Sequence, residues 1–113
     1  MKSLWHSGVV ENIDEASKEL HHHSSKKQIQ SVIGKLVEAY KAADSVYGSL
    51  TKNNAPTRDL LFMAAFLNGM TATIRALQAH IGKTQPIEWI VHEIQGNIEM
   101  AKEIGTGLSK SGL

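Results

Sequence analysis

Hydrophobic residues recur at steps of three and four along most of the chain, and this spacing places them on one face of an α-helix. The pattern is clear at about residues 25–51, 56–81 and 85–104, and weaker over about residues 9–20. None of these segments alternates strictly between apolar and polar residues, as a half-buried strand would. The pattern therefore predicts an all-α protein.

The polar connections between these segments carry the signals of helix starts and ends. The segment Ser25–Gln28 has the spacing of a capping box, in which the side chain of each end residue bonds to the backbone N–H of the other. Pro56 and Pro86 suit the first turn of a helix, and Gly82 suits a position just past a helix end. Glycines recur after residue 104, so we expect a frayed tail over residues 105–113.

The run His21–His23 is the expected break between the N-terminal helix and the first long helix. The alternative is one helix that runs straight through from Val9. Short connections favour antiparallel neighbours. We therefore expect a single domain, residues 1–113, that folds as an antiparallel helical bundle of three long helices and a short N-terminal helix.

The segment 56–81 is apolar on two sides. Its large residues form a heptad seam with alternating steps of three and four, made of Leu60, Met63, Leu67, Met70, Ile74, Leu77 and Ile81. Its small residues form a second seam on roughly the opposite side, made of Ala65, Gly69, Ala72, Ala76 and Ala79. We expect neighbours to cover both sides of this helix. Either a second chain or the N-terminal helix would cover the side of the small residues. The pattern therefore predicts a homo-oligomer formed through this helix.

A narrow polar stripe runs beside the heptad seam, made of Asn68, Thr71, Arg75 and Gln78. One interpretation is a pocket in which the Arg75 guanidinium pairs with the anion of a ligand or a partner chain. The other is a stripe that faces water, or an Asn68 side chain that fixes the helix register.

The two tryptophans stand apart from the apolar seams. Trp89 is a candidate contact for a ligand or partner, because tryptophan is enriched among the residues that dominate interfaces. The alternative is that Trp89 packs at the edge of the bundle. We place Trp5 in a loosely held N-terminus.

Histidines offer the clearest metal-ligand chemistry. His21, His22 and His23 are candidates, but adjacent helical residues point about 100° apart and do not easily share one ion. Glu88 and His92 lie four apart, and no second pair completes a helical di-metal site. The chain has no cysteine, which excludes thiol catalysis and Cys-based zinc or iron–sulfur sites. We predict no metal and no cofactor.

Composition narrows the function further. The 113 residues carry 12 Lys+Arg and 11 Asp+Glu, a net charge of +1, which does not suit a polybasic nucleic-acid binder. The first residues lack the apolar region of a signal peptide, and the longest apolar run, residues 60–67, is too short to span a membrane. We therefore expect a cytoplasmic protein that binds neither nucleic acid nor membrane.

The chain has no glycine-rich phosphate loop and no nucleophile motif, so we do not expect an enzyme. The sequence favours a small non-catalytic interaction or regulatory module, of the inhibitor or immunity type, that self-associates and binds a protein partner. The alternative is a helical bundle that binds or sequesters a small anionic metabolite or nucleotide.

Overall fold

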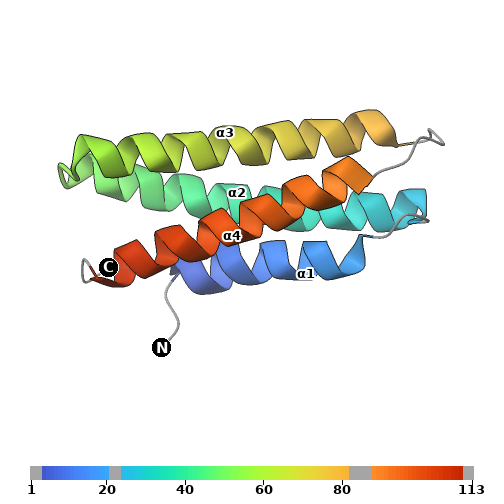
Figure 1. Cartoon of the computed structure of the whole chain (residues 1–113), viewed down its shortest axis with the longest axis horizontal. Coiled ribbons are helices and arrows are strands. Elements are labelled where there is room, and N and C mark those ends of the chain that lie inside the picture. Colours follow the sequence, from blue (N-terminus) through green and yellow to red (C-terminus); the bar gives the residue numbers. More distant parts are fainter. Residues whose placement is uncertain (1–3, 21–23, 82–87, 111–113) are drawn as a thin grey trace.

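The computed structural model describes residues 4–20, 24–81 and 88–110, and all the regular structure in these ranges is helical (Figure 1). The elements in chain order are η1 (Trp5–Val10), α1 (Glu11–Glu19), α2 (Lys26–Lys52), α3 (Thr57–His80) and α4 (Glu88–Lys110). The protein is therefore an all-α helical bundle, as the hydrophobic spacing predicts.

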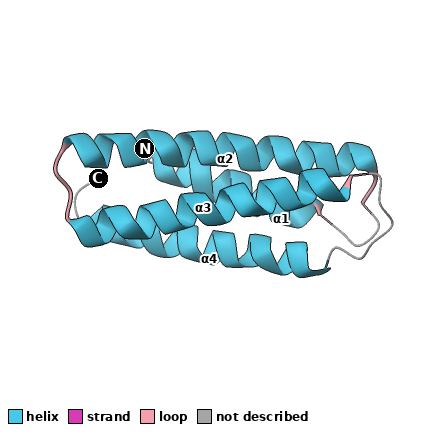
Figure 2. Cartoon of the chain, turned by 90° about the horizontal axis from the view of Figure 1, so that it is seen from above, coloured by secondary structure: helices cyan, strands magenta, loops and turns pink. Residues whose placement is uncertain are grey.

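Consecutive helices run antiparallel, and the start of η1 lies at the same end of the bundle as the end of α4 (Figure 1, Figure 2). The helix α1 packs against α2 and α4, and α3 packs against the same two helices. The bundle measures 45 × 27 × 18 Å. As a result α1 and α3 lie diagonally across from each other.

The boundary between α1 and α2 is set by the local signals seen in the sequence. Leu20 is extended, with φ −83° and ψ 125°, which ends α1. The Gln28 N–H donates to Ser25 Oγ at 3.1 Å, and the Ser25 N–H donates to Gln28 Oε1 at 2.8 Å. This capping box starts α2, so two helices occupy the region and not one. Residues His21–His23 lie outside the described residues.

The prediction of a loosely held N-terminus is wrong for Trp5. This residue lies in η1, a π-helical turn that leads directly into α1, and its side chain is only 3% exposed. The indole Nε1–H donates to the backbone oxygen of Ala101 at 2.7 Å, and the ring lies 5.6 Å from that of Phe66. Burial of a large aromatic ring with its N–H satisfied outweighs the weak helix signals of residues 4–8.

The prediction of a frayed tail from residue 105 is also wrong, because α4 continues to Lys110. Gly105 lies against Trp5, and a Cβ at this position would come within 3.0 Å of the Trp5 Cδ1 atom. Glycine costs about 1 kcal/mol of helix propensity relative to alanine. Because Gly105 has no side chain, the Trp5 indole can approach α4. Gly105 was expected to end this helix but lies inside it and packs against Trp5.

Within the single chain the small-residue side of α3 is only partly covered, so the alternative in which the N-terminal helix covers it is wrong. The large-residue seam is buried or half-buried against α2 and α4, but Ala65, Ala72 and Ala79 of the small-residue seam are exposed. The N-terminal helix does not cover them, because the described part of α1 contacts only η1, α2 and α4. Gly69 is half-buried instead, near the side chain of Asn97 in α4.

By length and composition alone, α3 is the one helix of the described ranges that could cross a membrane. The core helices of soluble proteins meet the same criterion, but such helices are mostly buried. In this protein 33% of the most apolar window of α3 is buried, through side chains such as Met63, Phe66 and Leu77 that pack inside the bundle. We therefore describe α3 as a bundle helix with one uncovered side.

Candidate functional site

Three of the four residues in the predicted polar stripe lie together at the surface. Thr71, Arg75 and Gln78 line a shallow depression of about 280 Å³ between α3 and α2. From α2 the depression is lined by Val37 and Tyr40. The volume is near the lower limit of small-molecule sites.

Arg75 is the only charged side chain that lines this depression. It is exposed, and it makes no ion pair or hydrogen bond with the other described residues. The Thr71 hydroxyl donates to the backbone oxygen of Leu67 at 3.1 Å, so its lone pairs remain available as acceptors. The guanidinium can therefore present a planar set of donors to a carboxylate or phosphate.

The contribution of α2 to this depression was not found in the sequence. Tyr40 and Val37 follow the apolar rhythm of their helix, so both are assigned to the core by periodicity alone. In the structure both are half-buried, at the border where α2 meets α3. Which helix packs beside the polar stripe depends on how the bundle is arranged, and no local sequence pattern predicts that arrangement.

Asn68 does not line the depression but belongs to a second surface, which shares Arg75 with the depression. We call this surface the outer face of α3, and it consists of Arg58, Leu61, Ala65, Asn68, Ala72, Arg75 and Ala79. These residues are spaced 3, 4, 3, 4, 3 and 4 apart, and all seven are exposed. The outer face is thus a continuous helical stripe that no other described element of the chain covers.

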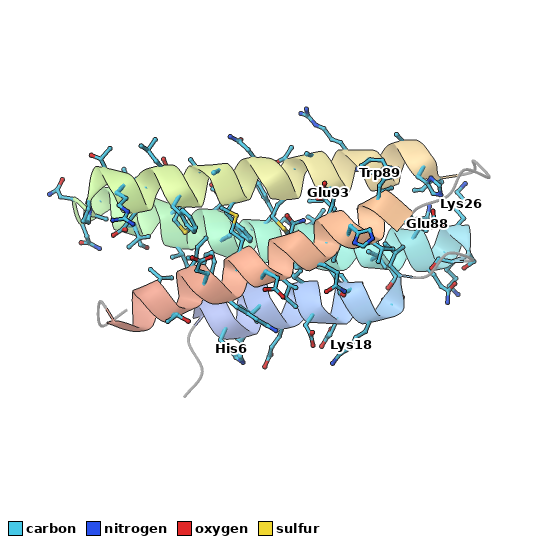
Figure 3. The ribbon with its side chains drawn as sticks, viewed as in Figure 1. His6, Lys18, Lys26, Glu88, Trp89 and Glu93 are labelled. Atoms are coloured by element: carbon cyan, nitrogen blue, oxygen red, sulfur yellow. The ribbon has the colours of Figure 1, made fainter. Side chains whose placement is uncertain are left out.

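Large apolar side chains lie at both ends of this side of the molecule. At the start of α3, Leu61 is 66% exposed and Phe62 is 41% exposed. Beside the end of α3, Trp89 of α4 is 57% exposed, and it lies with Glu93 on the edge of α4 that borders α3 (Figure 3). Trp89 is therefore a surface residue and does not join the polar stripe. The hydrophobic pattern alone gives Leu61 no role, although this residue continues the spacing of Ala65 and Asn68.

Two further depressions adjoin each other at the end of the bundle where α2 ends and α3 begins. One has a volume of about 320 Å³, with Phe62 and Glu103 among its lining residues, and the other has a volume of about 190 Å³ and includes Leu4. Leu50 and Leu108 line both. The lining residues come from η1, α2, α3 and α4, so only the assembled fold brings them together.

The candidate metal ligands do not form a site within the described ranges. No group of three His, Cys, Asp or Glu side chains in residues 4–20, 24–81 and 88–110 is placed to hold a metal ion. Glu88 and His92 are exposed on α4. The candidates His21, His22 and His23 lie outside the described residues.

The clearest electrostatic perturbation lies away from these surfaces, between α1 and α2. Hydrogen bonds from Lys35, and then from Ser31, lower the pKa of the Glu19 carboxyl below its usual value. The same contact with Glu19 raises the pKa of Lys35. This pair ties α1 to α2, and we assign it to the stability of the bundle.

Comparison of the chain with known protein families, with curated proteins and with solved structures gave no significant match. The proposals below therefore rest on the residues and geometry of this chain alone.

Proposed function

We propose that the protein is a small non-catalytic interaction module, of a regulatory, inhibitor or immunity type, that self-associates through the outer face of α3 and binds a macromolecular partner. The uncovered side of α3 is the observation that carries this proposal. Leu61 is 66% exposed there, within a regular helical stripe that also contains three alanines.

An exposed helical stripe with heptad spacing is suited to pairing with another helix. Alternating steps of three and four keep the same residues on one line along the helix, as in the seams of coiled coils. Exposed apolar patches rimmed by polar residues mark interaction surfaces. The outer face combines both kinds of residue, because Arg58, Asn68 and Arg75 are interspersed among its alanines and Leu61.

The first test is the mass of the native particle over a concentration series, measured by sedimentation equilibrium or light scattering. We expect the mass to rise from that of the 12.4 kDa chain to a multiple of it. A particle that stays monomeric up to about 1 mM, the weakest affinity that we would regard as specific, contradicts the proposal.

A matched pair of variants locates the surface. Asn68→Glu places a charge in the centre of the outer face, and we expect it to weaken self-association at least about tenfold, which corresponds to about 1.4 kcal/mol. Gln30→Glu adds the same charge at an exposed position of α2 and is expected to leave the association unchanged. Equal effects of the two variants would show that the outer face is not the contact surface.

The depression at Arg75 supports a second candidate function, the binding of a small anionic metabolite or nucleotide. Its support is the placement of the Arg75 guanidinium, which makes no ion pair with the other described residues, beside Thr71, Gln78 and Tyr40 in a single concave surface. Because the site is open and solvated, an ion pair there contributes at most about 1 kcal/mol. Affinity would therefore have to come from several contacts together.

A thermal-shift screen with nucleotides, phosphosugars and dicarboxylates tests this second candidate. A ligand that binds only the folded state raises the melting temperature. We expect any such rise to disappear in Arg75→Met and to persist in Arg58→Met, which removes an arginine of the same helix outside the depression. No shift across the panel, or an equal loss in both variants, contradicts a site at Arg75.

A further inference from the structure

We infer that the self-association proposed above takes the form of a dimer in which two α3 helices pair antiparallel, with Asn68 of each copy at the two-fold axis. This inference rests on the proposed function and specifies its partner as a second copy of this chain. In this arrangement Arg58 and Phe62 of one copy meet Glu93 and Trp89 of the other.

The spacing of the outer face is nearly symmetric about Asn68. Ala65 lies three residues before Asn68 and Ala72 four residues after it, and Leu61 and Arg75 lie seven residues away on either side. A two-fold interface requires one patch to be complementary to itself. An antiparallel pair centred on Asn68 sets Ala65 against the partner's Ala72, and small side chains at these positions allow the helix axes to approach to about 8 Å.

The charges of the outer face favour the antiparallel direction over the parallel one. The only charged residues of the stripe are Arg58 and Arg75, and both are cationic. A parallel pair in register would set each arginine opposite its own copy, and like charges directly opposite destabilise a helix pair. In the antiparallel pair Arg75 lies opposite the partner's Leu61, and Arg58 lies opposite the partner's Ala79.

The edges of the stripe provide complementary charges. Arg58 and Phe62 face the α4 side of α3, because both line a depression with Glu103 and Ile104 of α4. When a two-fold axis relates an antiparallel pair of α3 helices, the α4 helices of both copies lie on the same side of the pair. The start of α3 in one copy then lies beside the end of α3 in the other. The partner's Arg58 is thereby brought to the end of α3 where Glu93 lies on the adjoining edge of α4 (Figure 3).

The same exchange brings the exposed aromatic residues together. Phe62 lies at the start of α3 and Trp89 beside its end. In a single chain the two cannot meet, since the 24 residues of α3 span about 36 Å. Antiparallel pairing places Phe62 and Arg58 of each copy beside the partner's Trp89, where aromatic and cation–π contacts form twice per dimer.

The size of the surface sets the expected affinity. A stripe about 36 Å long and about 10–12 Å wide is roughly half of the ~800 Å² that each partner buries in a standard interface. The aromatic contacts at both ends extend this area. We therefore expect a dissociation constant in the micromolar range, about −8 kcal/mol.

Disulfide trapping tests the direction and the register, because the chain has no cysteine. We expect Asn68→Cys to form a covalent dimer on mild oxidation, since facing Cα atoms across a close helix pair lie within the 7 Å that a disulfide spans. Leu61→Cys should not cross-link with itself, because its two copies lie about 21 Å apart along the antiparallel pair. A mixture of Leu61→Cys and Arg75→Cys should give the mixed dimer.

Charge reversal tests the contact between the ends without cysteines. Arg58→Glu and Glu93→Arg are each expected to weaken dimerisation about five- to tenfold, and the double variant is expected to recover to within about threefold of the natural chain. Additive weakening in the double variant contradicts contact between Arg58 and the partner's Glu93.

The outcomes separate this inference from the proposed function. A natural chain that never dimerises overturns both. Self-pairing of Leu61→Cys in a chain that does dimerise shows parallel helices, which overturns the antiparallel arrangement and leaves the interaction module standing.

Discussion

Trp5 and Trp89 occupy opposite surroundings in the bundle. Trp5 is 3% exposed, donates its indole N–H to the Ala101 backbone oxygen and packs on the ring of Phe66. Trp89 is 57% exposed on the edge of α4 that borders α3. One tryptophan therefore joins three elements of the fold, and the other is available to a second molecule.

The regions around the two tryptophans also differ in whether neighbouring helices cover them. On the covered side η1 approaches α2 so closely that a Cβ on Gly8 would lie 2.8 Å from the Ala42 Cβ. Small residues also occur on the outer face of α3, but Ala65, Ala72 and Ala79 are exposed, and no other element in the described ranges covers them. Small residues thus permit close packing in the first region, and in the second they leave room for a helix that the described part of the chain does not supply.

The largest expected effect comes from comparing the tryptophans directly. Trp5→Ala should lower the free energy of unfolding by about 3–5 kcal/mol, because it empties a buried aromatic site. Trp89→Ala should change it by less than about 0.5 kcal/mol, because the side chain is largely in solvent. Urea denaturation at a low protein concentration, where self-association does not contribute, measures both. A similar loss in the two variants would remove the contrast on which the interface proposal depends.

Matched glycine variants test the close approach on the covered side. Gly8→Ala should destabilise the protein by about 1–3 kcal/mol, because the new methyl group overlaps the rigid Cβ of Ala42. Gly34→Ala should stabilise it by about 1 kcal/mol, because the position is exposed inside α2 and a Cβ there meets no atom within 4 Å. Thermal or urea unfolding gives both values. Stabilisation by both substitutions would show that η1 and α2 are not in close contact.

The sequence predicts the architecture because the dominant signals are local. The hydrophobic rhythm of three and four gives the long helices, and the Ser25–Gln28 capping box gives the start of α2. The errors concern residues whose state is decided by distant neighbours. Trp5 is held by Ala101, which is 96 residues away in the chain, and Gly105 stays helical while packing against Trp5.

The candidate site was predictable only in part for the same reason. The spacing of Thr71, Arg75 and Gln78 places them on one line, and the structure brings them to one depression. The contribution of Tyr40 depends on α2 lying beside that line. The uncovered state of the small-residue seam depends on α1 packing against α2 and α4 and not on α3.

A buried hydrogen bond between α3 and α4 is expected to contribute less to the free energy of unfolding. A second threonine of α3 provides the control variant. Thr73 is buried, donates to the Gly69 backbone oxygen and accepts a hydrogen bond of 2.9 Å from Asn97 Nδ2. Thr73→Val leaves the Asn97 amide without this partner and should cost about 1–2 kcal/mol, at the lower part of the range for such losses.

Thr71→Val is the control for this substitution. Thr71 makes the same bond to the backbone oxygen four residues earlier, but it makes no hydrogen bond to the described side chains of α4. We expect a change below about 0.5 kcal/mol. Equal losses in the two variants would mean that the local bond, and not the contact with α4, supplies the stability.

The smallest expected effect concerns the ion pair that ties α1 to α2 on the covered side. Because hydrogen bonds from Lys35 and Ser31 lower the pKa of Glu19 from its ordinary value of 4.5, the folded state favours the carboxylate. The stabilisation is therefore fully present above about pH 4.5 and is lost as the pH falls through the lowered pKa of the folded state. Lys35, whose pKa is raised from 10.5, stays protonated throughout this range.

We expect the difference in urea midpoint between the natural chain and Glu19→Gln to be constant from pH 5 to pH 8 and to shrink below about pH 4.5. The effect is small because both partners are partly exposed and solvent screens the pair. Glu38→Gln removes the same charge from an exposed contact on α2 that is 3.8 Å long, so it controls for net charge. A difference for Glu19→Gln that does not change with pH, or that equals the difference for Glu38→Gln, would show that α1 is held by its apolar residues alone and that covered and uncovered surfaces differ only in packing.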